Sequence, residues 1–218
     1  VGELLGTAWE DSAGSADALN GLAEKAGSKL GLVDLARRTW HLPETKNQRD
    51  HTIHLSVFAM GQLRCLLDLR EAGPAAPWLF PAFSGDGPVG VKSLGKQLSD
   101  RQRVPDRRLR GRTKATSSLL LPGGRWTAHD LRRTSATLMA SLGISGDVID
   151  ECLNHMIESR VRRTYIRDRR APEQARAFEV LGQLLESLKS GANRNARAGQ
   201  RHHAVSNVVG LDDRSTAA

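Results

Sequence analysis

Two donor-rich side chains lie three residues apart in the stretch Ala128–Thr134, which reads AHDLRRT. If this stretch is helical, His129 and Arg132 share one face, because residues three apart are neighbours on a helix surface. An imidazole and a guanidinium on one face can donate hydrogen bonds to the same phosphate group. The pair therefore predicts a site that handles a phosphate.

Two further fragments offer side chains for the same chemistry. Leu153-Asn154-His155 adds a second imidazole, and Tyr165 follows it ten residues later. Tyr165 is the only tyrosine of the chain, and six of the eleven residues from 160 to 170 are arginine. A phenol has a pKa of about 10 and needs cationic neighbours to act as a nucleophile near neutral pH. A phenol among arginines and histidines suits attack on a phosphodiester.

Taken singly, each of these residues also has an ordinary structural explanation. His129 suits a helix cap or the surface, Arg132 a solvated charge, and Tyr165 a core or rim aromatic. The stretch 142–154 could instead be half of a DNA-reading helix-turn-helix. We favour phosphodiester chemistry, because a tyrosine needed only for packing is seldom surrounded by this much positive charge.

The charge of the chain favours the same kind of partner. Its 218 residues carry 32 Lys+Arg against 24 Asp+Glu, a net charge of +8, and all but seven of the basic residues are arginine. Residues 101–170 alone hold 16 basic and seven acidic residues. A moderate excess can be a solvated surface, but arginine concentrated in one stretch favours a polyanion, since its planar fork matches phosphate.

Composition excludes several classes of protein. Two cysteines in 218 residues rule out a disulfide framework and a cysteine-based zinc cluster. The chain has no apolar run of 18 residues, and its first residues, VGELLGTAWED, lack the basic and apolar segments of a signal peptide. We therefore expect a cytoplasmic protein with no membrane partner.

Local patterns predict the elements that must position the candidate residues. Alternating apolar and polar residues over 40–43 and 52–55 indicate a β-hairpin, with the polar stretch Glu44–Asp50 between its strands. Ser56 is a suitable N-cap for a helix from about Val57 to Glu71. The predicted apolar stripe of that helix is Phe58, Leu63, Leu66, Leu67 and Leu69.

The second half of the chain is predicted to be helical. Thr127 and Asp130 form a capping-box pattern before a helix that ends at Gly143. Further helices are expected over Asp147–Leu153, around Val161–Arg169 and from Pro172 onward. The residues expected to face inward are Leu131, Ser135, Leu138 and Leu142 in the first of these helices, and Phe178, Leu181, Leu185 and Leu188 in the last.

The remaining segments carry weaker signals. Val1–Trp9 reads as the end of a helix, and the segments near 11–31 and 103–123 read as loops or insertions. Residues 190–218 have little to bury and are predicted to be a disordered tail. The expected fold is mainly α with a small antiparallel β-sheet, an α+β domain over residues 1–189.

These pieces resemble the tyrosine recombinases, or phage-type integrases. The matching motifs are HDLRRT at 129–134, LNH at 153–155 and the tyrosine of RRTYIR at 162–167, in the family's order and near its usual spacing. GELLGTAWED at the start and PETKNQRDHTIHLS at 43–56 resemble the family's helix leading into a small sheet and its β-hairpin. The resemblance covers roughly residues 1–188 and is nearest to the integrases of mobile islands and prophages, which implies a bacterial or phage-encoded catalytic domain.

The resemblance implies a role for each matching residue. Tyr165 would attack the scissile phosphate and form a 3′-phosphotyrosyl link, while Arg132 would hold the non-bridging oxygens. His129 and His155 would assist in proton handling and charge stabilisation. Lys46, at the hairpin turn, would donate a proton to the leaving 5′-oxygen, although its position alone suits a solvated turn lysine equally well.

The resemblance also implies partners. These are double-stranded DNA attachment sites and, on DNA, a homotetramer of the full-length protein, which would perform site-specific recombination and integration without a cofactor or a metal. We expect Arg133, Arg162 and Arg163 to bind DNA phosphates. A metal-dependent nuclease built on His51 and His54 is disfavoured, because residues three apart in a strand project to opposite faces.

One part of the family pattern falls outside this sequence. The first catalytic arginine of the family stands three residues before the glutamate that corresponds to Glu3, and hence ahead of Val1. Two interpretations stay open: the catalytic domain of a longer, working recombinase, or a catalytically inactive DNA-binding remnant of a decayed integrase. Formation of a covalent adduct with DNA distinguishes them.

Overall fold

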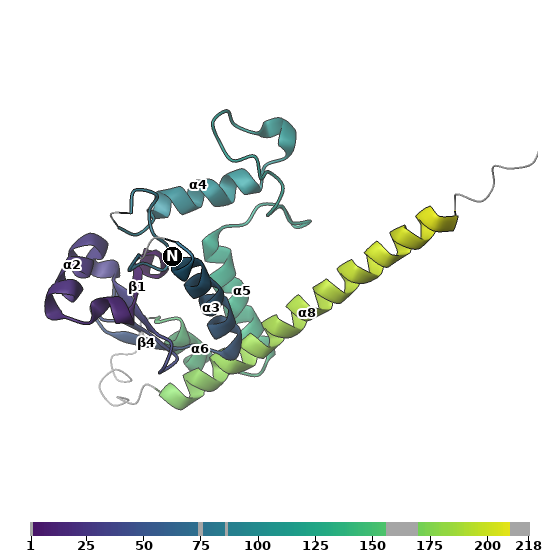
Figure 1. The fold of residues 1–218 in the computed structure, drawn as a ribbon. Helices are drawn as coiled ribbons and strands as arrows, with labels where there is room; N and C mark the ends of the chain where they lie inside the picture. Colours follow the sequence, from purple (N-terminus) through teal and green to yellow (C-terminus); the bar gives the residue numbers. More distant parts are fainter. Residues whose placement is uncertain (1, 74–75, 86, 156–169, 210–218) are drawn as a thin grey trace, which may run out of the picture.

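The computed structural model describes residues 2–73, 76–85, 87–155 and 170–209, apart from the side chains of residues 28 and 192–209. A small sheet lies on one side of the molecule with helices packed around it, and a long C-terminal helix extends away from the body (Figure 1). The fold is α+β, as predicted from the sequence.

The sheet contains four strands: β1 (Thr7–Trp9), β2 (Gly31–Asp34), β3 (Thr39–Leu42) and β4 (His51–His54). Their order is β1-β2-β3-β4. Strands β3 and β4 form the predicted antiparallel hairpin, with Leu42 opposite His51. Strand β1 pairs with β2 in parallel, so the sheet is mixed and not purely antiparallel.

Two secondary-structure predictions for the first 31 residues were wrong, namely a helical end over residues 1–9 and a loop over residues 11–31. Only Gly2–Leu5 (α1) is helical at the start, and the chain then enters β1 because backbone groups of Thr7 and Trp9 pair with the segment around Trp78. The segment 11–31 forms α2 (Ala16–Ala26), flanked by the short 3₁₀ helices Glu10–Ala13 and Gly27–Lys29. Ser15 caps α2 by accepting from the Ala18 N–H at 3.1 Å.

Helix α3 (Val57–Glu71) packs against the sheet and begins at the predicted cap. The Ser56 hydroxyl accepts from the Ala59 N–H at 3.3 Å. The core between α3 and the sheet consists of Trp9, Val33, Leu55, Met60, Leu63 and Leu79. Leu69, predicted to face inward, is 70% exposed, because none of the described elements covers that part of the helix.

A second core joins the helices α5 (Ala128–Ser141), α6 (Gly146–Cys152) and α8 (Ala171–Val209). Its buried members are Met139, Val148, Ile149, Cys152, Ala177 and Leu181. Leu131 and Leu188, both predicted to face inward, are each 56% exposed. In α5 the fully buried residue is Met139, which was not predicted, while the predicted Leu138 packs against this core as a partly buried residue.

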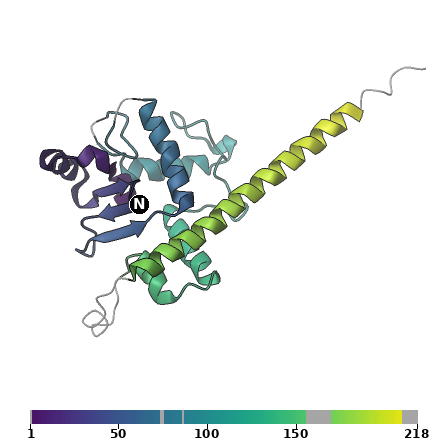
Figure 2. The same ribbon diagram turned by 60° about the horizontal axis from the view of Figure 1, so that its bottom comes forward.

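Helix α8 ties the helical part to the sheet. It passes beside α3, β4, α5 and α6 (Figure 2). Glu179 Oε2 accepts from Arg38 Nη2 at 3.1 Å and from the Val57 N–H at 3.3 Å. The helix continues to Val209, whereas the composition predicted disorder from residue 190.

Helix α4 (Val91–Arg101) and the 3₁₀ helix η3 (Pro105–Arg107) precede α5 in the chain. The segment 103–123 is otherwise made of turns and irregular backbone, in agreement with the prediction of a loop. Within the described part of the chain, no helix is long and apolar enough to cross a membrane.

Candidate active site

The first turn of α5 is fixed by its capping residues. Asp130 Oδ2 accepts hydrogen bonds from the Thr127 hydroxyl at 2.8 Å and the Thr127 N–H at 2.9 Å. These bonds, aided by the nearby Arg133 and His129, hold the pKa of the Asp130 carboxyl below its ordinary value. The predicted capping box is thus present, and it places Arg132 one turn after His129.

Arg132 joins α5 to the end of α6. Its Nη2 donates to the backbone carbonyl of Leu153, the residue that directly follows α6. The side chain is half-buried, and its other N–H groups make no hydrogen bond to any residue that the structure describes. A guanidinium held through one nitrogen keeps its remaining donors for an anionic oxygen.

The imidazole of His155 is held by a carboxylate of α6. His155 Nδ1 lies 2.9 Å from Asp150 Oδ1, and the His155 N–H donates to the Asp150 carbonyl at 2.8 Å. A carboxylate at Nδ1 favours the proton on that nitrogen and leaves Nε2 directed at other partners. The His155 side chain is 47% exposed, so a ligand can reach the ring.

Asn154 connects this corner to the β-hairpin. Its φ of 51° lies in the left-handed region, which asparagine tolerates better than most residues. The Asn154 carbonyl accepts from Asn47 Nδ2 at 3.0 Å, in a half-buried position. Because Leu153 and Asn154 are adjacent, the hairpin turn and Arg132 are both attached to the same backbone corner.

The hairpin turn is also bonded internally. Thr45 is buried; its N–H donates to the Arg49 carbonyl at 3.0 Å, and its carbonyl accepts from the Gln48 N–H at 2.8 Å. Lys46 lies in this turn, exposed, directly before Asn47. The structure therefore brings the hairpin turn with Lys46, Arg132 and His155 to one region.

The other predicted residues have different surroundings. His129 is exposed and makes no hydrogen bond to a described residue. The Arg133 side chain is 74% exposed and lies 3.7 Å from Asp130 in a surface ion pair. Tyr165, Arg162 and Arg163 lie outside the described residues.

Two contacts of the candidate site have no counterpart in the sequence motifs. Asn47 was a polar residue within a turn, and nothing in its local pattern pointed to Asn154. Asp150 gave a weak sequence signal for its contact with His155. It lies in the predicted helix Asp147–Leu153, five residues before His155. Both act by hydrogen bonds to the backbone or to an imidazole nitrogen, which motif spacing does not reveal.

Potential metal ligands are scattered among the described residues. Among the residues described, no group of three or more His, Cys, Asp and Glu is placed to bind one. His51 is buried and His54 half-exposed on strand β4, consistent with projection to opposite faces.

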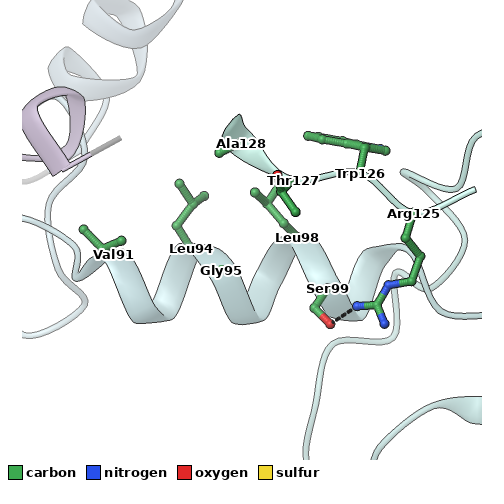
Figure 3. A pocket seen from close by; sticks show the side chains of 9 residues that line it. All are labelled: Val91, Leu94, Gly95, Leu98, Ser99, Arg125, Trp126, Thr127 and Ala128. Atoms are coloured by element: carbon green, nitrogen blue, oxygen red, sulfur yellow. Dashed lines mark hydrogen bonds between the residues drawn. The ribbon is translucent and has the colours of Figure 1, made fainter. Parts of the chain in front are cut away.

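A cavity of about 210 Å³ opens beside the start of α5. Figure 3 shows Val91, Leu94 and Leu98 projecting from α4 toward the backbone of Thr127 and Ala128. Ser99, Arg125 and Trp126 complete one end of its lining. The cavity is mainly apolar, so it suits packing better than phosphate binding.

Arg132 and His155 are thus held at one backbone corner of a small α+β domain, with donors that suit a phosphate. The comparison with protein-family models then identifies the chain: it belongs to the phage integrase family, whose model matches residues 22–171. It is thus a tyrosine recombinase catalytic domain of a family that performs DNA recombination and integration and binds DNA. No curated protein and no solved structure matched the chain.

Proposed function

We propose that this chain cleaves and rejoins duplex DNA through a covalent link between Tyr165 and a 3′-phosphate. The observation that carries the proposal is the corner Leu153–Asn154, which joins Arg132 to the hairpin turn of Asn47. Two segments that the family pattern assigns to one reaction thus meet at a single backbone corner. Tyr165 lies outside the described residues but within the family match over residues 22–171.

The proposed step is a transesterification. The Tyr165 phenolic oxygen attacks the phosphorus, a phosphorus–oxygen bond to tyrosine forms, and the bond to the 5′-oxygen breaks. The phenol loses its proton to a nearby base, for which His129 and His155 are the candidates, and the 5′-oxygen leaves as a hydroxyl. Because one phosphoester replaces another, the 5′-hydroxyl of a partner strand can reverse the step without an energy source.

Arg132 and His155 would stabilise the charge on the phosphate oxygens during this step. Both side chains are held by protein groups before any substrate binds, Arg132 by the Leu153 carbonyl and His155 by Asp150. Donors that are already oriented need no rearrangement as charge develops. One such donor lowers a barrier by about 3–4 kcal/mol in oxyanion sites.

Lys46 would supply the proton to the leaving 5′-oxygen. An ammonium is a suitable donor because the alkoxide that would otherwise leave is far more basic. The exposed Lys46 side chain has no bonding partner among the described residues, and the bond from Asn47 to Asn154 sets the distance of the turn from the corner.

The decisive experiment incubates the chain with a nicked duplex that cannot be religated after cleavage. We expect a protein–DNA adduct that survives denaturation, disappears on protease digestion and leaves a free 5′-hydroxyl that polynucleotide kinase can label. Tyr165→Phe removes only the phenolic oxygen, so it should form no adduct while binding the same duplex with unchanged affinity. An adduct with Tyr165→Phe would show that another residue is the nucleophile.

The same experiment decides between the working enzyme and the inactive remnant. A remnant would bind duplex DNA but form no adduct even with Tyr165 intact. For the active protein we further propose assembly as a homotetramer on two attachment sites, which the family membership supports. Cross-linking on DNA that yields no species above a dimer would refute that assembly.

A further inference from the structure

The segment between α4 and α5 forms a loop whose two ends are tied together. We call residues 103–117 the basic loop. At its base, the Ser117 N–H and hydroxyl donate to the Arg103 carbonyl at 2.8 and 3.2 Å. The Leu119 N–H donates to the Arg101 carbonyl at 3.0 Å. Two of these three bonds join backbone groups, so the base of the loop is closed largely by the backbone.

A buried carboxylate strengthens this base. Asp100 is only 3% exposed, and its two oxygens lie 3.4 Å from Arg103 Nε and 3.3 Å from Arg112 Nη1. One carboxylate thus holds a residue from each limb of the basic loop. Removing one partner of a buried ion pair leaves the other charge buried without a partner, which is unfavourable. The two ion pairs of Asp100 therefore oppose opening of the loop at its base.

The base is also attached to the start of the helix that carries Arg132. Gln102 is buried, and its side-chain amide exchanges two hydrogen bonds with the backbone of Trp126, at 2.8 and 2.9 Å. Trp126 stands two residues before the first residue of α5. Figure 1 shows the loop beyond the end of α4, with the chain running from it into α5. The loop is therefore fixed on the body that contains the candidate active site.

The tip of the basic loop presents positive charge that the protein does not neutralise. Arg107, Arg108, Arg110 and Lys114 are all exposed, and none forms an ion pair with a described residue. The only acidic residue between 103 and 117 is Asp106. Charges of one sign that lie together in a short loop repel one another, and an anionic partner relieves this repulsion.

We propose that the basic loop binds the phosphate backbone of duplex DNA. Duplex DNA carries one negative charge per about 1.7 Å of helix axis, so several exposed arginines of one short loop can each meet a phosphate. Such contacts position DNA without reading its sequence. The inference deepens the proposed function and rests on it for the DNA substrate beside Arg132.

The test compares two variants that remove the same charge. The loop variant is R107Q/R108Q/R110Q, and the control is K25Q/R64Q/R176Q, whose residues are exposed on α2, α3 and α8. Binding to a duplex of unrelated sequence is measured against salt concentration. We expect the loop variant to reduce the slope of log affinity against log salt by about 2–3, near 0.9 for each lost phosphate contact, and the control to reduce it by less than about 1.

A loop variant that matches the control, or a wild-type chain that binds no duplex, would overturn the proposal. Loss of folding is tested by the thermal midpoint of each variant. The single substitution R108E changes one exposed side chain and should also weaken binding to the duplex. The titrations are repeated with Tyr165→Phe, in which the proposed covalent step is absent. Failure of the proposed chemistry then leaves the binding difference intact, and failure of the loop proposal leaves adduct formation intact.

Discussion

Asn47 of the hairpin turn donates a hydrogen bond to the carbonyl of Asn154 at 3.0 Å, across 107 residues of sequence. This bond fixes the turn that carries Lys46 against the corner that also accepts from Arg132. The proposed proton donor and the proposed phosphate-binding arginine therefore share one anchoring point.

Replacing Asn47 by alanine should slow strand cleavage through its effect on Lys46. Loss of one hydrogen bond of about 1 kcal/mol predicts a decrease of about fivefold in the single-turnover rate, while Lys46→Ala should lose about 100-fold or more. A substrate with a 5′-bridging sulfur needs no proton on its leaving group, so it should restore both variants. An equal defect of Asn47→Ala on both substrates would show that the residue does not act through Lys46.

Arg132→Ala should lower the rate of the chemical step far more than DNA affinity. Removal of one oriented donor to developing charge costs about 100- to 1,000-fold in rate, whereas binding draws on many phosphate contacts. Single-turnover cleavage and fluorescence anisotropy on the same duplex measure the two effects. A fall in affinity as large as the fall in rate would indicate a role in binding alone. Arg64→Ala, which removes an exposed arginine from α3, is the control.

Asp130→Asn should destabilise the protein in a pH-dependent way. The folded state lowers the pKa of Asp130, chiefly through its bonds from Thr127. A lowered carboxyl pKa contributes stability above the unfolded pKa, and this contribution is lost as the pH falls through the folded value. The thermal midpoint of the variant should therefore fall below wild type at pH 7, and the difference should shrink toward pH 2–3. A difference that is constant with pH would contradict the assignment.

The two cysteines should differ sharply in reactivity. Burial raises the pKa of the Cys152 thiol to about 12, whereas Cys65 is exposed on α3. Because the thiolate is the reactive form, iodoacetamide at pH 8 should modify one thiol per native chain and both after denaturation. Intact mass gives the count, and Cys65→Ser should leave the native chain unmodified. Modification of Cys152 in that variant at the rate of a free thiol would refute the prediction.

Gly182→Ala should weaken the contact between α8 and α3. A Cβ at this position would lie 2.6 Å from Ser56 Oγ, the atom that caps α3. We expect a loss of about 1–3 kcal/mol in the free energy of unfolding, measured by denaturant titration. Gly61→Ala is the matched control, because a Cβ at this position within α3 would meet no atom within 4 Å. This substitution should increase the free energy of unfolding by about 0.5–1 kcal/mol. Equal effects of the two substitutions would mean that the close approach is absent.

The local elements of this protein could be predicted because their signals lie within a few residues. Ser56 caps α3, Thr127 and Asp130 form the capping box of α5, and alternation over residues 40–55 marks the hairpin. In each case the groups that form the bond are neighbours in the sequence. The motif residues of the integrase family were found for the same reason, since residue type and spacing carry that signal.

The faces of the helices depended on which neighbours cover them. Leu69, Leu131 and Leu188 follow the helical period, yet all three are more than half exposed. Periodicity defines a possible apolar stripe, but burial requires another element over that part of the stripe. Met139 became the core residue of α5 because α6 and α8 pack on its side of the helix.

The sequence by itself determined the family, the α+β class, the hairpin, the capped helices and the residue types needed for phosphodiester chemistry. Only the tertiary structure decided that Asn47 meets Asn154, that Arg132 meets the Leu153 carbonyl and that Asp100 clamps the basic loop. The physical reason is that each of these contacts joins groups from different elements. Their hydrogen-bonding capacity is ordinary, and only the folded arrangement of these elements brings the partners within bonding distance.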